Sequence, residues 1–240
     1  MPQELEARET VGFGGLGARL NWLRAGVLGA NDGLVSGAGI CLGVAAANPA
    51  NTPAILTAGV AGLLAGSAAM AMGEYVSVSS QRDTEEALIQ KERHDLTHTP
   101  AEEFEELVAV YQGQGLTEST ARLVVEELTG HDPLAAHLRA EYGIHQEELT
   151  NPWHAALASA ISFTSGFVLP LLAIVLLPVG VRMPATLAVA LLGLGVTGWI
   201  SAHISGAEKK HHPMVRNLLG GGAAMALTWG IGHLFGVAVG

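Results

Sequence analysis

Residues 85–106 read EEALIQKERHDLTHTPAEEFEE, and this acidic segment lies inside an insert that is flanked by apolar segments with few charges. Residues 77–151 around it hold 16 of the 22 Asp and Glu residues but only 5 of the 12 Lys and Arg residues. Composition therefore divides the chain into an acidic, water-soluble insert and two apolar flanking parts. The predicted boundaries are 1–20 for an N-terminal segment, 21–80 and 152–240 for the apolar parts, and 81–151 for the insert.

The composition of the whole chain is typical of a membrane protein. Of its 240 residues 49% are hydrophobic, only 14% are charged, and 31 are glycine, which is too apolar and too glycine-rich for an average soluble domain. The net charge of -10 disfavours nucleic acid, which needs a basic surface, and favours cations as partners. A single cysteine, Cys41, excludes a disulfide framework and a multi-cysteine metal site.

Five apolar stretches are long enough to span a membrane. A helix needs about 20 mostly apolar residues to cross a hydrocarbon core of about 30 Å, because every backbone polar group must be satisfied internally. The stretches are residues 25–47, 54–76, 155–177, 185–207 and 217–240. Pro178 and Pro184 are expected to bracket the turn before the fourth stretch, and a basic loop, 209–216, is expected before the fifth. The sequence thus predicts an all-α, polytopic membrane protein with five transmembrane helices.

The positions of Lys and Arg predict the orientation of these helices. Arg19 and Arg24 precede the first stretch, Arg82 follows the second, and the basic cluster 209–216 lies between the fourth and fifth. Only Arg182 lies in the opposite loops. Because cytoplasmic loops collect Lys and Arg close to the membrane, we expect the N-terminus and the insert to be cytosolic and the C-terminus to be external.

The insert itself is predicted to be a small helical bundle. Apolar residues recur at helical spacing in 104–111, after the Thr99-Pro100 start signal, and two further helices are expected at 117–129 and 132–143. The helix of the second membrane stretch is expected to continue out of the bilayer to about Arg93.

Asp32 is the sharpest single signal in the membrane part. It lies eight residues after Arg24, about 12 Å along a helix, where an ionised group without a partner costs several kcal/mol. Met70 and Glu74 are i, i+4 neighbours on the second stretch, and both can meet Asp32 at a similar depth in the membrane. Two carboxylates and a thioether predict a transition-metal site, at which Asp32 could exchange a proton for a cation. The alternatives are a structural cap for Asp32, apolar packing for Met70 and a headgroup-level position for Glu74.

Paired acids and one His-Glu pair mark the insert as a second candidate metal site. Each pair shares a helix face: Glu92 with Asp95, Glu103 with Glu106, and His137 with Glu141. Periodicity does not separate the pair Glu103/Glu106 from the pair Glu102/Glu105, because they flank opposite edges of one apolar stripe. The alternative is a solvated acidic face without bound metal.

At these residues the chain resembles the vacuolar iron transporter family, from about Leu20 to the end. The resemblance rests on residues 29–35 (GANDGLV), 70–75 (MAMGEY) and 111–116 (YQGQGL), together with the acidic insert and three closing spans. It implies a homodimer of five-span subunits with the translocation path at the two-fold axis, lined by the first two spans. It also implies export of Fe²⁺ from the cytosol in exchange for protons.

The resemblance assigns roles to particular residues. Asp32 and Met70 match pore positions, and five acids match ligands of the family's metal-binding lobe: Glu92, Asp95, Glu103, Glu106 and Glu141. The chain departs from the family at three places. It has Gly62 where some members carry a pore acid, Asp95 where a Glu is expected, and His137 where a methionine ligand can stand. We hypothesise that Glu74 supplies the missing pore carboxylate.

The sequence thus predicts a proton-coupled transporter of divalent metals, Fe²⁺ first and Mn²⁺ second, with Zn²⁺ as a further candidate. Expected partners are protons, the bilayer and a second copy of the chain, with no prosthetic group and no enzymatic activity. A short chain with simple ends is typical of a prokaryotic member, so we expect the plasma membrane. The alternative is a membrane-anchored iron-binding or sensing module. A di-iron enzyme is disfavoured because the insert has no Glu-x-x-His motif.

Overall fold

The computed structural model describes residues 16–145, 150–205, 209 and 211–239, and within this part of the chain every regular element is a helix. The N-terminal segment up to residue 15 and Lys210 of the expected basic loop lie outside the described residues, as do the side chains of Arg19 and Arg24. The chain divides into two units, residues 1–75 with 152–240, and residues 76–151.

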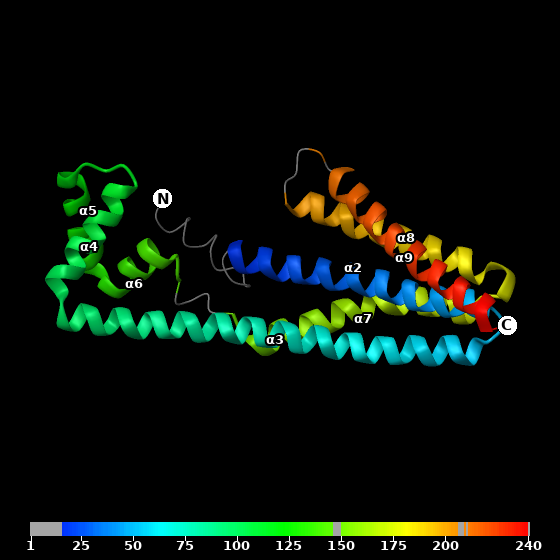
Figure 1. The fold of residues 1–240 in the computed structure, drawn as a ribbon. Helices are drawn as coiled ribbons and strands as arrows, with labels where there is room; N and C mark the ends of the chain where they lie inside the picture. Colours follow the sequence, from blue (N-terminus) through cyan, green and yellow to red (C-terminus); the bar gives the residue numbers. More distant parts are fainter. Residues whose placement is uncertain (1–15, 146–149, 206–208, 210, 240) are drawn as a thin grey trace, which may run out of the picture. The chain divides into compact units, whose positions relative to one another are not determined.

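Five of the described helices are long and apolar enough to cross a membrane. They are α2 (Leu16–Ala47), α3 (Thr52–His98), α7 (Pro152–Leu176), α8 (Val179–Ile204) and α9 (His211–Val239), and Figure 1 shows them along the chain. The prediction of an all-α chain with five helices of membrane-spanning length is therefore confirmed.

α3 belongs to both units. Its 47 residues correspond to about 70 Å at 1.5 Å per residue, more than twice the thickness of a hydrocarbon core. Its first half is apolar and its second half, from Val76 onward, is polar and charged. The predicted continuation of this helix beyond the membrane stretch is observed, and it ends at His98 rather than at Arg93.

Two predicted helix starts are wrong. α8 begins directly after Pro178 and contains Pro184, so the two prolines do not bracket a turn. A proline near the start of a helix removes only one backbone hydrogen bond, which membrane helices tolerate. α9 begins at His211, so most of the expected basic loop is helical. Pro213 is compatible with that start, because the first N–H groups of a helix have no intrahelical partner.

α2 is the central helix of the first unit and contacts α7, α8 and α9. Leu34, Ala38 and Cys41 of α2 are buried against Phe163 and Phe167 of α7. α2 and α7 can approach this closely because glycine has no side chain: a Cβ at Gly33 would overlap the carbonyl oxygen of Phe163. A Cβ at Gly66 of α3 would meet the ring of the same Phe163.

The second unit is a set of short helices together with the last part of α3. It contains α4 (Pro100–Gly113), α5 (Glu118–His131), α6 (Pro133–His137) and a π-helical turn, η1 (Leu138–Tyr142). The three predicted helices are present. The Thr117 hydroxyl and the Asp132 carboxylate accept hydrogen bonds from the first turns of α5 and α6, and the last helix ends at Gly143, whose φ is 66°.

Two small apolar clusters hold these elements together. One is built from Leu107, Val108, Ala121, Val125 and Ala136, and the other joins Ile89 of α3 to Leu138 and Ile144. Ile89 is one turn from Glu92 on α3, and Leu138 follows His137 directly. This second cluster therefore places polar residues of α3 and α6 next to each other.

Candidate metal centre

Four titratable side chains from four elements meet inside the second unit. Glu92 comes from α3, Glu103 from the first turn of α4, His137 from the end of α6 and Glu141 from η1. One ligand atom from each lies within 4.8 Å of all the others. Glu92 is 1% exposed, His137 0% and Glu103 8%, so the group is enclosed by protein.

The imidazole of His137 faces all three carboxylates. Its Nδ1 lies 2.8 Å from Glu141 Oε1, 3.0 Å from Glu92 Oε1 and 3.7 Å from Glu103 Oε2. Nε2 of His137, on the other side of the ring, has no hydrogen-bond partner among the described residues, and the only close contact given for Oε1 of Glu92 there is the one with Nδ1. Buried carboxylates without full compensation are costly, and a cation bound between these oxygens and Nδ1 would offset that cost.

The electrostatics of the group also favour a cation. Burial raises the pKa of Glu92 to about 7, and the charges of Glu141 and Glu103 add to the shift. Among the described residues, the only ion pairs of these three carboxylates are with His137. Three acids around one imidazole leave an excess of negative charge, which a divalent ion would balance.

Local sequence explains how each ligand is positioned. His137 and Glu141 are four residues apart on the continuous run of α6 and η1, so both project to one side. Glu103 lies in the first turn of α4, where a carboxylate interacts favourably with the helix dipole. Glu92 shares a face of α3 with buried Ile89.

The structure does not bring two of the expected ligands of the insert into this group. Asp95 lies beside Lys91, with 3.1 Å between Nζ and Oδ2, and Glu106 is exposed. Glu105 forms a bidentate pair with Arg122 at 2.7 Å for both contacts, which holds the pKa of Glu105 below its usual value. Neither predicted pair on α4 therefore acts as a unit, and Glu103 alone reaches the group.

The expected pore residues belong to the first unit and are less enclosed. Asp32 is exposed, and its Oδ1 accepts a hydrogen bond from Ser36 Oγ at 2.8 Å. Among the described residues no ion pair includes Asp32. Met70 packs against the apolar core of the unit, and Glu74 is half-buried. Gly62 faces Ile40 and Phe167.

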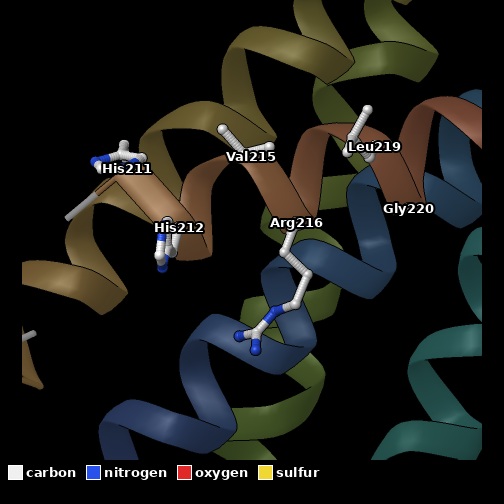
Figure 2. Close-up of a pocket in the computed structure, with 6 residues that line it drawn as sticks. All are labelled: His211, His212, Val215, Arg216, Leu219 and Gly220. Carbon is white, nitrogen blue, oxygen red and sulfur yellow. The ribbon is translucent and has the colours of Figure 1, made fainter. Parts of the chain in front are cut away.

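A surface opening of about 590 Å³ lies elsewhere, at the start of α9. It is lined by His211, His212, Val215, Arg216, Leu219 and Gly220. Figure 2 shows Val215 and Leu219 pointing to one side of the helix and His212 and Arg216 to the other. Among the described residues that line this opening there is no carboxylate and none of the expected metal ligands.

Comparison with known proteins gives a consistent relationship along the chain. The model of the VIT family matches residues 23–233. A protein of Acanthamoeba castellanii named vacuolar iron transporter is 40% identical over 220 residues, which cover 89% of this chain and 78% of that protein. Vacuolar iron transporter homolog 1 of Oryza sativa subsp. japonica is 40% identical over 92% of this chain and 76% of its own length.

A third relative, vacuolar iron transporter homolog 3 of Arabidopsis thaliana, is 35% identical over 91% of this chain and 85% of its own length. These matches include both apolar parts and the acidic insert between them. With five membrane-length helices, a buried acidic group in the insert and a family match over most of its length, the chain belongs to the VIT family.

Proposed function

We propose that this protein transports divalent transition metals across a membrane, with Fe²⁺ as the main substrate and Mn²⁺ as the second. The observation that carries the proposal is the buried group of Glu92, Glu103, His137 and Glu141 in a chain of the VIT family. The names of the relatives support iron as the substrate, since they are vacuolar iron transporters or their homologues.

The ligand chemistry of the group suits these ions. Carboxylate oxygens favour hard cations such as Mn²⁺, whereas imidazole favours Fe²⁺, Zn²⁺ and later metals. A set of three carboxylates and one imidazole is therefore intermediate in ligand hardness. Fe²⁺ and Mn²⁺ suit such a set better than Ca²⁺ or Cu²⁺. The role proposed for the group is to collect the ion from the cytosol.

The route through the membrane is proposed to pass Asp32. An exposed carboxylate within an apolar span is expensive in lipid, so another protein surface or a water-filled path should cover it. A homodimer with Asp32, Met70 and Glu74 facing the two-fold axis would provide that environment. A carboxylate held there could release a proton as it takes a metal ion, which is the elementary step of proton-coupled antiport.

The proposed orientation follows from the Lys and Arg distribution, which favours a cytosolic insert and an external C-terminus. The physiological direction would then be export from the cytosol, across the plasma membrane if the host is a prokaryote.

Flux measurements test this function. Purified protein in liposomes should move Fe²⁺ when a pH gradient is imposed, and Asp32→Asn should abolish this flux without changing metal binding by the insert. Glu103→Gln with Glu141→Gln should lower binding and reduce flux mainly at scarce Fe²⁺, because collection rather than passage is impaired.

A matched control is Glu126→Gln with Glu127→Gln, which removes two exposed acids from the same unit and should leave binding and flux unchanged. Absence of flux in the wild-type protein, with Fe²⁺ binding intact, would contradict transport and favour an anchored iron-binding module.

A further inference from the structure

Two histidines near the end of α3 lie outside the buried acidic group. His94 and His98 are four residues apart on one continuous helix, and a helix places such residues on one face. Both are exposed, and their ring centroids are 3.9 Å apart with 27° between the ring planes. In this stacked arrangement the two ring planes are nearly parallel, so both rings reach one ion only after the exposed His94 ring turns about its side-chain bonds.

The orientation of the His98 ring is fixed by the backbone. Its Nδ1 lies 2.8 Å from the carbonyl oxygen of His94. A carbonyl oxygen can only accept, so Nδ1 carries the proton and the neutral ring keeps its free lone pair on Nε2. Metal-bound histidines usually donate their other N–H to a carbonyl or a carboxylate, and His98 has this arrangement without metal.

The pair is separate from the buried group although Glu92 is close in sequence. At about 100° per residue, His94 lies roughly 200° and His98 roughly 240° around the helix from Glu92. Burial agrees with this geometry, because Glu92 is 1% exposed whereas both histidines are at the surface. An ion held by the pair would therefore not share ligands with the buried group.

We propose that His94 and His98 form a second, surface metal site that binds a borderline divalent cation such as Zn²⁺ or Ni²⁺. Nε2 of His98 and one ring nitrogen of His94 are the protein ligands, and water completes the coordination. Imidazole ligands bind Zn²⁺ and Ni²⁺ well and Mn²⁺ poorly, so the two sites differ in the metals they accept. The inference does not depend on transport and goes beyond the proposed function.

Metal counting on the full-length protein tests this site. Metal-free protein in detergent is dialysed against Zn²⁺ alone or Mn²⁺ alone, and bound metal per chain is measured. His94→Ala with His98→Ala should lower bound Zn²⁺ by about one ion per chain and leave Mn²⁺ unchanged. Each single substitution should lose as much Zn²⁺ as the double one, because chelation needs both rings.

Two comparison variants make the result specific. His131→Ala with His145→Ala removes two exposed imidazoles from the same unit and should leave bound Zn²⁺ unchanged. Glu103→Gln with Glu141→Gln should remove Mn²⁺ binding while the Zn²⁺ that depends on His94 and His98 remains. Unchanged Zn²⁺ in the His94/His98 variant, or an equal loss in the His131/His145 variant, would overturn the proposal. So would loss of the histidine-dependent Zn²⁺ in the Glu103/Glu141 variant.

Discussion

Glu92 is a buried acid whose charge is useful for metal binding and unfavourable for the metal-free fold. Its pKa is raised from 4.5 to about 7, so between these pH values the folded state holds a proton that the unfolded state has lost. The contribution of Glu92 to stability is then most favourable below pH 4.5 and falls as the pH rises towards 7. Glu92→Gln removes this dependence. In metal-free protein it should match the wild type near pH 4 and be more stable at pH 8, by up to about 3 kcal/mol.

Hydrogen exchange of residues 100–142 in the full-length protein measures this difference in stability between wild type and variant. The two proteins are compared at the same pH, because the intrinsic exchange rate itself depends on pH. The same substitution should weaken Fe²⁺ binding, because it removes a ligand. Equal protection of the two proteins at pH 8 would show that Glu92 is not destabilised by its surroundings. Glu126→Gln, an exposed acid of α5, is the control and should have no effect at either pH.

Arg182 is the one basic residue that the sequence places in the loops opposite the insert, and the structure gives it a packing role. It is 1% exposed, and its guanidinium donates to the Pro49 carbonyl, to Thr52 Oγ1 at 3.0 Å and to the Ile174 carbonyl at 3.5 Å. It therefore ties α8 to the end of α7 and to the turn that joins α2 and α3.

Arg182→Met should destabilise the first unit by about 2–4 kcal/mol, because buried carbonyl and hydroxyl groups lose their donor. Arg182→Lys should recover only part of this loss in stability, since an ammonium group cannot donate in the same directions as the planar guanidinium. All four tryptophans lie in this unit, so tryptophan fluorescence during thermal unfolding reports on it. Arg216→Met removes an exposed charge from α9 and should leave the unfolding midpoint unchanged.

Residue patterns predicted the four members of the buried group but could not select them from a longer set. Spacing places Glu103 and Glu106 about 60° apart around α4, so a small rotation of the helix about its axis decides which acid faces His137 of α6. Only the packing of Leu107 and Val108 sets that rotation. The i, i+4 spacing of His94 and His98 is visible in the sequence, but only the structure shows that both are exposed and that their rings stack.

At the scale of helices, close packing in the first unit depends on glycines that lie directly against a neighbouring helix. Gly33→Ala would place a methyl group against the backbone oxygen of Phe163, so α2 and α7 must separate. We expect a loss of about 1–3 kcal/mol and a lower midpoint in the fluorescence unfolding assay. Gly195→Ala on α8 is the matched control, because a Cβ there meets nothing within 4 Å. Equal midpoints for both variants would contradict the close approach.

Hydropathy predicts that the membrane-length helices exist, but it does not predict where several of them begin and end. Pro178 and Pro184 both resemble breakers in the sequence, but only Pro178 ends up outside α8. The π-helical turn at Leu138–Tyr142 has no signature that single-residue preferences report. It matters for the site, since it carries Glu141 next to His137.

At the scale of the whole molecule, Asp32 bears on how copies of the chain associate. Leu28 lies one turn before Asp32 on the same face of α2 and is 62% exposed. Any surface that covers Asp32 in the membrane should therefore also cover Leu28. If that surface is a second copy of the chain across a two-fold axis, the two Leu28 positions lie near each other.

Cysteine cross-linking tests this arrangement, because the only native cysteine, Cys41, is buried. Leu28→Cys in membranes should give a covalent dimer with a short bis-maleimide. Leu192→Cys on α8, where the wild-type side chain is 71% exposed, is the control and should stay monomeric because it faces lipid. Cross-linking at 192 without cross-linking at 28 would place the contact between copies on α8. Asp32 would then lie outside the interface, and the proposed metal path along the dimer axis would be wrong.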